Sequence, residues 1–207
     1  MPAPTAGKGR ASGKVAASNL QRSTDVLLLV DFISPLDFPG ADDLGPYALA
    51  AAKATAELRH SLDVKQVQCV YANDNYGDWH DDFKDIWSRC SKAGGVAAKM
   101  ARVLKPRPQD CTILKPRHSA FYATPLDLLL RELGCKRLIV TGVAADSCVL
   151  FSAMDAYVRG YRVWVPQDCI AAENDQDRIK SVEHMERVLK ADVRPSTLQS
   201  PAKARRR

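Results

Sequence analysis

The chain has 207 residues, of which 46% are hydrophobic, and this size and composition predict one domain with a sizeable core. No apolar stretch approaches the roughly 20 residues of a membrane span, and no signal-peptide core is visible, so neither a membrane protein nor a secreted protein is expected. The formal net charge of +6 is carried by the ends, because residues 1–24 and residues 196–207 each contribute +4 whereas residues 25–195 contribute −2.

Both basic ends are rich in Ala, Ser, Gly or Pro and lack hydrophobic periodicity. We therefore predict disordered tails at 1–24 and 196–207 on either side of one domain at 25–195. A basic tail can bind nucleic acid, but no aromatic or groove-reading element accompanies these tails, so nucleic acid is not expected as a partner. The N-terminal segment lacks acidic residues, as transit peptides do, but it also holds few large apolar side chains.

The six cysteines form no C-x-x-C pair and show no zinc-ligand spacing. Three of them, Cys69, Cys111 and Cys169, lie in or beside apolar strand patterns, where they are expected to pack in the core. This usage favours a reducing compartment, and we predict a cytoplasmic protein.

Strand and helix patterns alternate along the body of the chain. Strands are predicted at 26–31, 66–72, 111–115, 137–142 and 161–165, with a possible sixth near 192–194, and helices at 43–61, 123–134, 147–159 and 175–190. The helix at 123–134 has the clearest limits, because Thr124 is a cap, Pro125 lies in the first turn and Gly134 ends it. The alternation predicts a three-layer α/β/α fold, with a mostly parallel sheet of five or six strands and helices on both faces.

The region 73–105 interrupts this alternation. It begins, directly after a predicted strand, with the run Asn-Asp-Asn-Tyr-Gly-Asp-Trp-His at 73–80. A long connection at the C-terminal edge of a strand usually has a functional role. Weak helical periodicity over 82–87 and 96–104 predicts short helices within it.

Two apolar strand patterns end in a charged residue. The apolar run 26–30 predicts a strand buried on both faces, and Asp31 follows at its C-terminal edge, where open α/β sheets place their ligands. The short strand at 111–115 ends in Lys115. Each residue also has a structural explanation, because Asp31 can cap the following turn and Lys115 can be a solvated lysine at a strand end.

A cysteine lies where a predicted strand turns into a predicted helix. The apolar residues 137–140 lead into a turn of small residues, and Cys148 starts the helical pattern. The N-terminus of a helix supplies free N–H groups and positive partial charge, so a thiol there is expected to ionise more easily than one in solvent. The segment alone is explained equally well by a buried structural cysteine.

Parallel strands end at one edge of a sheet, so Asp31, Lys115 and Cys148 are expected to meet there. A carboxylate, an ammonium group and a thiol at one edge form a nucleophile with its activating partners.

Several motifs in this order resemble those of the isochorismatase-like cysteine hydrolases, which include nicotinamidases, carbamoylsarcosine amidohydrolases, and ureide and biuret-type hydrolases. The resemblance runs from about residue 25 to 172, through the segments 31–32, 115–121, 142–149, 153–163 and 168–171. It implies that Asp31 is the general base, Lys115 its charged partner and Cys148 the nucleophile. It also implies a cis peptide between Val143 and Ala144, which would aim the Ala144 N–H into an oxyanion hole with the N–H of Cys148.

Many nicotinamidases of this family bind a metal through an Asp-x-His pattern after the second strand and through further histidines. Here Asp-Trp-His at 78–80 has that spacing but is offset, whereas directly after the strand Asp-Asn-Tyr at 74–76 has a tyrosine in place of the histidine. The remaining histidines, at 60, 118 and 184, do not pair with His80 at ligand spacing. We therefore expect no metal and no other cofactor. This argues against nicotinamide as the substrate, because the family uses the metal to hold the pyridine nitrogen.

The leading hypothesis is a metal-independent cysteine hydrolase that cleaves a C–N bond of a small amide, ureide or carbamoyl compound through a thioester. The alternatives are a nicotinamidase with a variant metal site and a non-catalytic binding protein with the family fold. The resemblance also implies a homo-oligomer, either a dimer or a tetramer. Aromatic and amide side chains suit a small planar amide, and the candidate substrate-binding residues are Phe32, Asp37, Phe38, Asn73, Asn75, Trp79, Phe121 and Tyr122.

Overall fold

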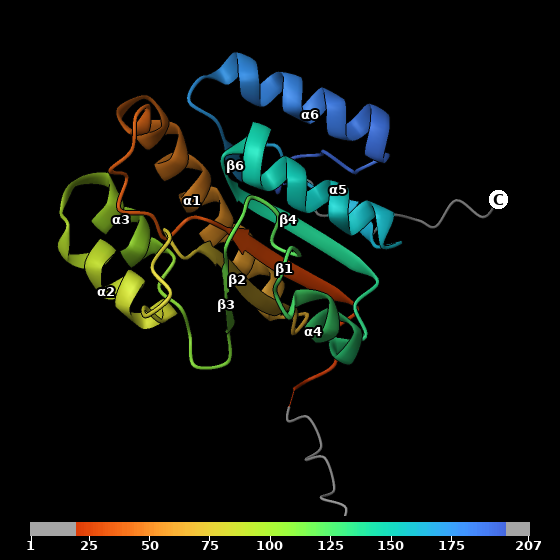
Figure 1. The fold of residues 1–207 in the computed structure, drawn as a ribbon. Helices are drawn as coiled ribbons and strands as arrows, with labels where there is room; N and C mark the ends of the chain where they lie inside the picture. The colour runs from red at the N-terminus through yellow and green to blue at the C-terminus, as the bar shows by residue number, and fades with distance from the viewer. Residues whose placement is uncertain (1–19, 198–207) are drawn as a thin grey trace, which may run out of the picture.

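The computed structural model describes residues 20–197, and a parallel sheet forms the middle layer of this part of the chain (Figure 1). The strands are β1 (Asp25–Val30), β2 (Gln68–Asp74), β3 (Cys111–Lys115), β4 (Arg137–Val143), β5 (Arg162–Trp164) and β6 (Ile170–Ala171). Their order is β3-β2-β1-β4-β5, β6 also pairs with β4, and every one of these pairings is parallel.

Helices cover both faces of the sheet (Figure 1). One face packs against α1 (Ala41–Asp63), α2 (Phe83–Lys92) and α3 (Gly95–Val103), and the other against α4 (Leu126–Leu133), α5 (Leu150–Val158) and α6 (Asp175–Leu189). The predicted three-layer α/β/α fold with a mostly parallel sheet of five or six strands is thereby confirmed, and the sheet has six strands. None of the helices between residues 20 and 197 is long and apolar enough to cross a membrane.

The central strand β1 contributes to both hydrophobic cores. Val26, Leu28 and Val30 pack toward α4, α5 and α6, whereas Leu27 and Leu29 pack toward α1, α2 and α3. All five side chains are at most 1% exposed. A strand covered on both faces needs an unbroken apolar run, which explains why this segment of the sequence does not alternate between apolar and polar residues.

The connection between β2 and β3 contains two helices near the predicted places. The Asp82 side chain accepts the backbone N–H groups of Lys84 and Asp85, and the Asp85 side chain accepts the N–H of Asp82. This reciprocal capping box fixes the start of α2. The second predicted segment forms α3.

The helix predicted at 123–134 is shorter at its start than expected. It begins at Leu126, whose N–H donates to the Thr124 hydroxyl at 3.2 Å. Gly134 ends it in the left-handed conformation, with φ of 76°, as the sequence predicts.

The sixth strand is not where the sequence predicted it. The segment near 192–194 contributes one isolated bridge, between Asp192 and Trp164, whereas the sixth strand is β6. A two-residue strand is too short to show any periodicity, so sequence pattern did not reveal it.

The helix predicted from residue 147 begins with a π-helical turn, η1 (Ala145–Val149), before α5. The N–H of Val149 donates to the carbonyl of Ala144, five residues earlier, at 3.1 Å. Cys148 therefore lies in a π-helical turn and not in the first turn of an α-helix. Such turns occur frequently at functional sites.

Most of both predicted tails, residues 1–19 and 198–207, lies outside the described residues. The ends of the described part are held by the domain. Ser23 N–H donates to the Leu133 carbonyl at 2.8 Å, and the Ser196 N–H and hydroxyl donate to the Asp168 carboxylate at 2.8 and 2.6 Å.

Candidate active site

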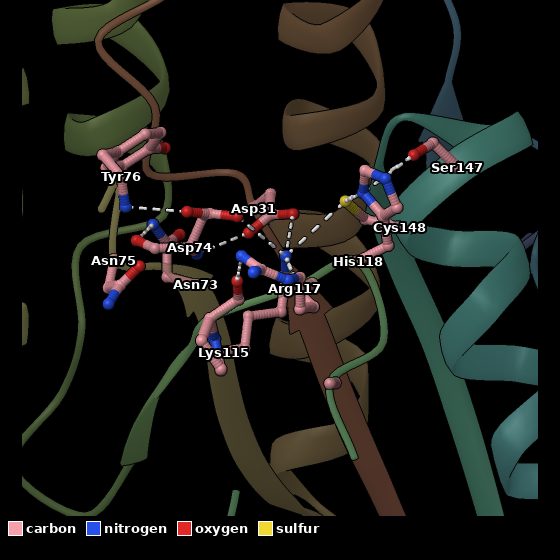
Figure 2. Close-up of polar contacts among 12 residues, drawn as sticks. Asp31, Asn73, Asp74, Asn75, Tyr76, Lys115, Arg117, His118, Ser147 and Cys148 are labelled. Carbon is pink, nitrogen blue, oxygen red and sulfur yellow. Dashed lines mark hydrogen bonds and ion pairs between the residues drawn. The ribbon is translucent and has the colours of Figure 1, made fainter. Parts of the chain in front are cut away.

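Four candidate functional side chains lie at the C-terminal edge of the sheet (Figure 2). Asp31 directly follows β1, Asp74 and Lys115 are the last residues of β2 and β3, and Cys148 lies in η1 just beyond β4. The register of β2 and β3 places Asp74 opposite Lys115. Because β1 pairs with both β2 and β4, Asp31 lies between the Asp74–Lys115 pair and the turn that carries Cys148.

Asp31 and Lys115 form a buried ion pair. Lys115 Nζ lies 2.8 Å from Asp31 Oδ2, and the Lys115 side chain is 0% exposed. The other carboxylate oxygen of Asp31 accepts the backbone N–H of Asp74 at 2.7 Å. These bonds fix the carboxylate, whose residue adopts the left-handed conformation with φ of 51°.

Asp74 is a second carboxylate partner of the lysine. Its Oδ2 lies 3.4 Å from Lys115 Nζ, and the ammonium group also donates to the Arg117 carbonyl at 3.1 Å. The charge of Lys115 is therefore shared between two carboxylates, a feature that sequence reasoning missed. The last residue of β2 was considered only as part of a variant metal pattern.

The Cys148 sulfur lies 3.5 Å from Lys115 Nζ. Burial and, after it, the hydrogen-bonded Asp31 carboxylate together raise the pKa of the Cys148 thiol to about 12, against the opposing effect of Lys115. The expectation that the thiol ionises more easily than in solvent is therefore wrong. The thiol is less acidic than expected because Cys148 is buried beside a carboxylate. In addition, the helix N-terminus expected from the sequence is a short π-helical turn.

The neighbouring charges also affect the carboxylate and the ammonium group. Burial raises the pKa of Asp31, against the opposing effect of Lys115. Burial disfavours the charge on Lys115, but Asp31, Cys148 and Asp74 hold the pKa of Lys115 above its ordinary value. A carboxylate with a raised pKa accepts a proton more readily, which suits a general base.

The backbone before Cys148 turns sharply. Gly142 has φ of 135°, and a Cβ atom at this position would lie 2.1 Å from the Val30 carbonyl oxygen, so only glycine fits against β1. The peptide bond between Val143 and Ala144 is cis, as the sequence resemblance implies. An oxyanion hole formed by the N–H groups of Ala144 and Cys148 stays a prediction.

A cavity of about 510 Å³ opens onto the Cys148 sulfur. Five carboxylate residues contribute to its lining: Asp31, Asp74, Asp146, Glu173 and Asp177. Phe38 and Tyr76 add aromatic surface. The cavity is thus small, partly aromatic and rich in negative charge.

Of the candidate substrate-binding residues, Phe38 lines this cavity, whereas the two other phenylalanines pack in the hydrophobic cores. Phe32 is 1% exposed in the core beneath α1, and Phe121 is 5% exposed in the core on the opposite face of the sheet. Trp79 and Tyr122 are 78% and 60% exposed and do not line the cavity. Asp37 is also exposed and outside the lining.

The two candidate asparagines hold the backbone of the loops around the site. Asn73 donates to the Ile33 carbonyl at 2.8 Å and accepts the Ile33 N–H at 3.1 Å. Asn75 accepts the Gly77 N–H at 3.1 Å. Both side chains are buried and outside the cavity lining, so the structure gives them a positioning role for the segments after β1 and β2.

The structure brings His118 and Ser147 to the sulfur, which sequence reasoning missed. His118 Nδ1 lies 3.6 Å from Cys148 Sγ and 3.3 Å from Ser147 Oγ (Figure 2). His118 was weighed only as a possible metal ligand. The available signal was its position three residues after Lys115, in the segment that leaves the C-terminal edge of the sheet.

The side chains after β2 do not fit the metal site of the family's nicotinamidases. The Tyr76 hydroxyl, in the place of a metal-binding histidine, donates to the Ile33 carbonyl at 3.0 Å, and Asp74 is paired with Lys115. Asp78 accepts the backbone N–H of His80, which is exposed. Within residues 20–197, no group of three or more His, Cys, Asp or Glu side chains is arranged to hold a metal ion.

Comparison with known proteins gives consistent matches. A family model described as an isochorismatase domain matches residues 26–195. The isochorismatase family protein YaaI of Bacillus subtilis is 35% identical over 176 residues, which cover 84% of this chain and 95% of the relative. The maleamate amidohydrolase of Pseudomonas putida is 27% identical over 150 residues, covering 70% of each chain.

Two solved structures show the same similarity. The N-carbamoylsarcosine amidase from Thermoplasma acidophilum superimposes with a TM-score of 0.66 and 27% identity, covering 86% of this chain and 99% of the other. The nicotinamidase from Staphylococcus aureus gives a TM-score of 0.64 and 26% identity, covering 83% and 98%.

Proposed function

Because the chain belongs to the isochorismatase family and is a hydrolase of C–N bonds, we propose that it acts through a thioester on Cys148. The proposed substrate is a small amide, ureide or carbamoyl compound, and no metal takes part. Asp31, Lys115 and Cys148 are the proposed catalytic residues.

The observation that carries this proposal is the set of contacts around one sulfur atom. Cys148 Sγ lies 3.5 Å from Lys115 Nζ, which lies 2.8 Å from Asp31 Oδ2, and Asp31 is also hydrogen-bonded to the thiol. A nucleophile, a base and a charged partner within direct contact form the arrangement that nucleophilic catalysis requires. Asp31 and Cys148 border a cavity large enough for a small substrate, and the buried Lys115 lies behind them.

In the acylation half of the reaction, Asp31 takes the thiol proton as Cys148 Sγ attacks the carbonyl carbon of the substrate. The carbonyl electrons move to the oxygen, which the N–H groups of Ala144 and Cys148 are proposed to bind. Collapse of this intermediate breaks the C–N bond, and Asp31 gives its proton to the departing nitrogen. Lys115 keeps its charge throughout and offsets the negative charge of the sulfur and the carboxylate.

The pKa of Cys148 is raised to about 12, which supports a mechanism in which the thiol proton passes to a base during the attack. A mechanism that starts from a free thiolate has less support. At neutral pH the resting nucleophile is the protonated thiol, so the attack needs a proton acceptor in contact with the sulfur. The buried Asp31 carboxylate meets this need, and its own raised pKa lowers the cost of accepting the proton.

The names of relatives support an amide-type substrate without fixing it. Relatives include a maleamate amidohydrolase and, over 58 residues at 47% identity, a ureidoacrylate amidohydrolase of Methylorubrum extorquens. A nicotinamidase activity has less support, since Tyr76 and Asp74 are engaged in other contacts where that site needs metal ligands. The expected homo-oligomer and the cytoplasmic location stay predictions.

A screen for ammonia release over primary amides, ureides and carbamoyl compounds tests the proposed activity. We expect at least one class to be hydrolysed, with a rate that chelator treatment leaves unchanged. The absence of hydrolysis across all three classes would favour the alternative of a non-catalytic binding protein.

A further inference from the structure

His118 is a titratable residue in contact with the Cys148 sulfur that has no task in the acylation described above. Its Nδ1 lies 3.6 Å from Sγ, and in Figure 2 the sulfur lies between the His118 ring and the Lys115 ammonium group. His118 also lines the cavity and is exposed. The sulfur therefore has two proton-exchanging neighbours, a buried carboxylate and an exposed imidazole.

We propose that the two neighbours divide the reaction, with Asp31 serving acylation and His118 acting as the general base of thioester hydrolysis. This inference rests on the proposed function, since it concerns the second half of the same reaction. It makes His118 a fourth catalytic residue, in contact with the reacting sulfur.

The surroundings of the two bases differ in the way this division requires. Asp31 is 8% exposed, and its two carboxylate oxygens bind the Asp74 N–H and the Lys115 ammonium group. His118 lies on the exposed side of the cavity, where solvent reaches it. An acyl group on Sγ therefore leaves His118 open to incoming water, and a neutral imidazole nitrogen within hydrogen-bond reach of that water can accept its proton.

The proton balance of hydrolysis closes through the same nitrogen atom. Neutral His118 Nδ1 takes a proton from water as the water oxygen bonds to the acyl carbon. The carbonyl electrons move to oxygen and return as the C–S bond breaks, which releases the carboxylic acid and leaves a thiolate. The imidazolium then returns its proton from Nδ1 to Sγ, across the 3.6 Å contact that the structure shows.

Two neighbours hold the imidazole in this orientation. Ser147 Oγ lies 3.3 Å from Nδ1, and the ring packs against Phe151 of α5 with 5.5 Å between ring centroids. Ser147 precedes the nucleophile in η1, so one short turn carries both the sulfur and a hydrogen-bonding partner of the base. Ser147 and Phe151 are accordingly positioning residues.

The test uses para-nitrophenyl acetate, an activated ester that acylates a thiol and whose leaving group needs no proton from Asp31. In His118→Asn we expect the acylation burst to keep its rate within about threefold, while the steady-state rate falls about 100-fold. The acetyl-enzyme should then accumulate, as intact-protein mass spectrometry would detect. Both kcat and KM should fall, leaving kcat/KM within about threefold of the original.

Two variants serve as controls. Cys148→Ser defines the background rate of ester hydrolysis by the other cysteines. His60→Asn alters an exposed histidine at the far end of α1 and should keep the rates of both the burst and the steady state. The thermal unfolding midpoint of His118→Asn checks that the fold is intact.

Two outcomes would overturn the division of labour: a His118→Asn steady state within about threefold of the original, or a burst slowed as much as the steady state. Ester turnover that does not depend on Cys148 would overturn the proposed function, and this inference with it.

Discussion

Lys115 Nζ lies 2.8 Å from Asp31 Oδ2 with no part of the lysine side chain exposed to solvent. The same ammonium group contacts Asp74 at 3.4 Å and the Cys148 sulfur at 3.5 Å. One buried positive charge therefore balances two carboxylates and also contacts the sulfur of the proposed nucleophile. Removing that charge affects all three neighbours, so substitution of Lys115 is the most informative test of the electrostatic balance of the site.

Lys115→Met should raise the pH at which Cys148 is alkylated, because Lys115 lowers the pKa of the thiol. It should also lower kcat by several orders of magnitude, since the negative charges of Asp31 and of the reacting sulfur would then face one another in a partly dry cavity. The measurement is the iodoacetamide rate of Cys148 against pH. Lys115→Arg is the matched variant and should also have a much lower kcat, because a planar guanidinium does not replace a compact ammonium group. An unchanged profile in Lys115→Met would mean that the lysine takes no part.

Asp31→Asn should separate thiol acidity from catalysis. Because the Asp31 charge helps to raise the pKa of Cys148 to about 12, its removal should lower that pKa, so more thiolate is present at any pH below the original midpoint. Hydrolysis should nevertheless fall by about 100-fold to 10,000-fold, since the proposed general base is lost. Thiolate absorbance against pH, corrected with Cys148→Ser, measures the first effect. A midpoint that stays or rises would contradict the assigned electrostatics.

Gly142→Ala should destabilise the fold and abolish activity. The new Cβ would lie 2.1 Å from the Val30 carbonyl oxygen, and φ at this position is 135°. The matched control is Gly77→Ala, because Gly77 also has positive φ but a Cβ there meets no atom within 4 Å. Thermal unfolding of the two variants gives the comparison. Equal midpoints would show that the contact with β1 does not constrain the turn before the nucleophile.

The negative lining of the cavity should disfavour substrates that carry a carboxylate. Five carboxylate residues line the cavity, and the buried Lys115 is already shared between Asp31 and Asp74. We expect maleamide to be hydrolysed roughly tenfold or more better than maleamate, which differs from it by a carboxylate in place of one amide. Glu173→Gln should narrow the difference, and so should added salt. A preference for maleamate would contradict this account of the charge.

The convergence of Asp31, Lys115 and Cys148 was predictable from the sequence, because each follows an apolar strand and parallel strands end at one edge. The contact between His118 and the sulfur was not predictable in this way. It depends on the path of an irregular segment after β3, which no periodicity describes. The raised pKa of Cys148 was missed for a related reason, since burial beside Asp31 is a property of the folded chain.

The substrate-binding residues were the least predictable part of the site. Phe32 and Phe121 lie near the proposed catalytic residues in the sequence, yet their side chains pack in cores on opposite faces of the sheet. Conversely, Glu173 and Asp177 line the cavity from a segment more than twenty residues beyond the nucleophile. Neighbourhood in sequence does not decide which face of a strand or loop a side chain occupies.

The measurement that tests the central claim most directly is the ammonia release of Cys148→Ala on the best substrate of the wild-type chain. The account predicts that the variant folds normally and keeps less than about a thousandth of the original rate, because losing a nucleophile usually costs more than that. A folded Cys148→Ala protein whose rate stays above about a thousandth of the original would contradict the thioester mechanism.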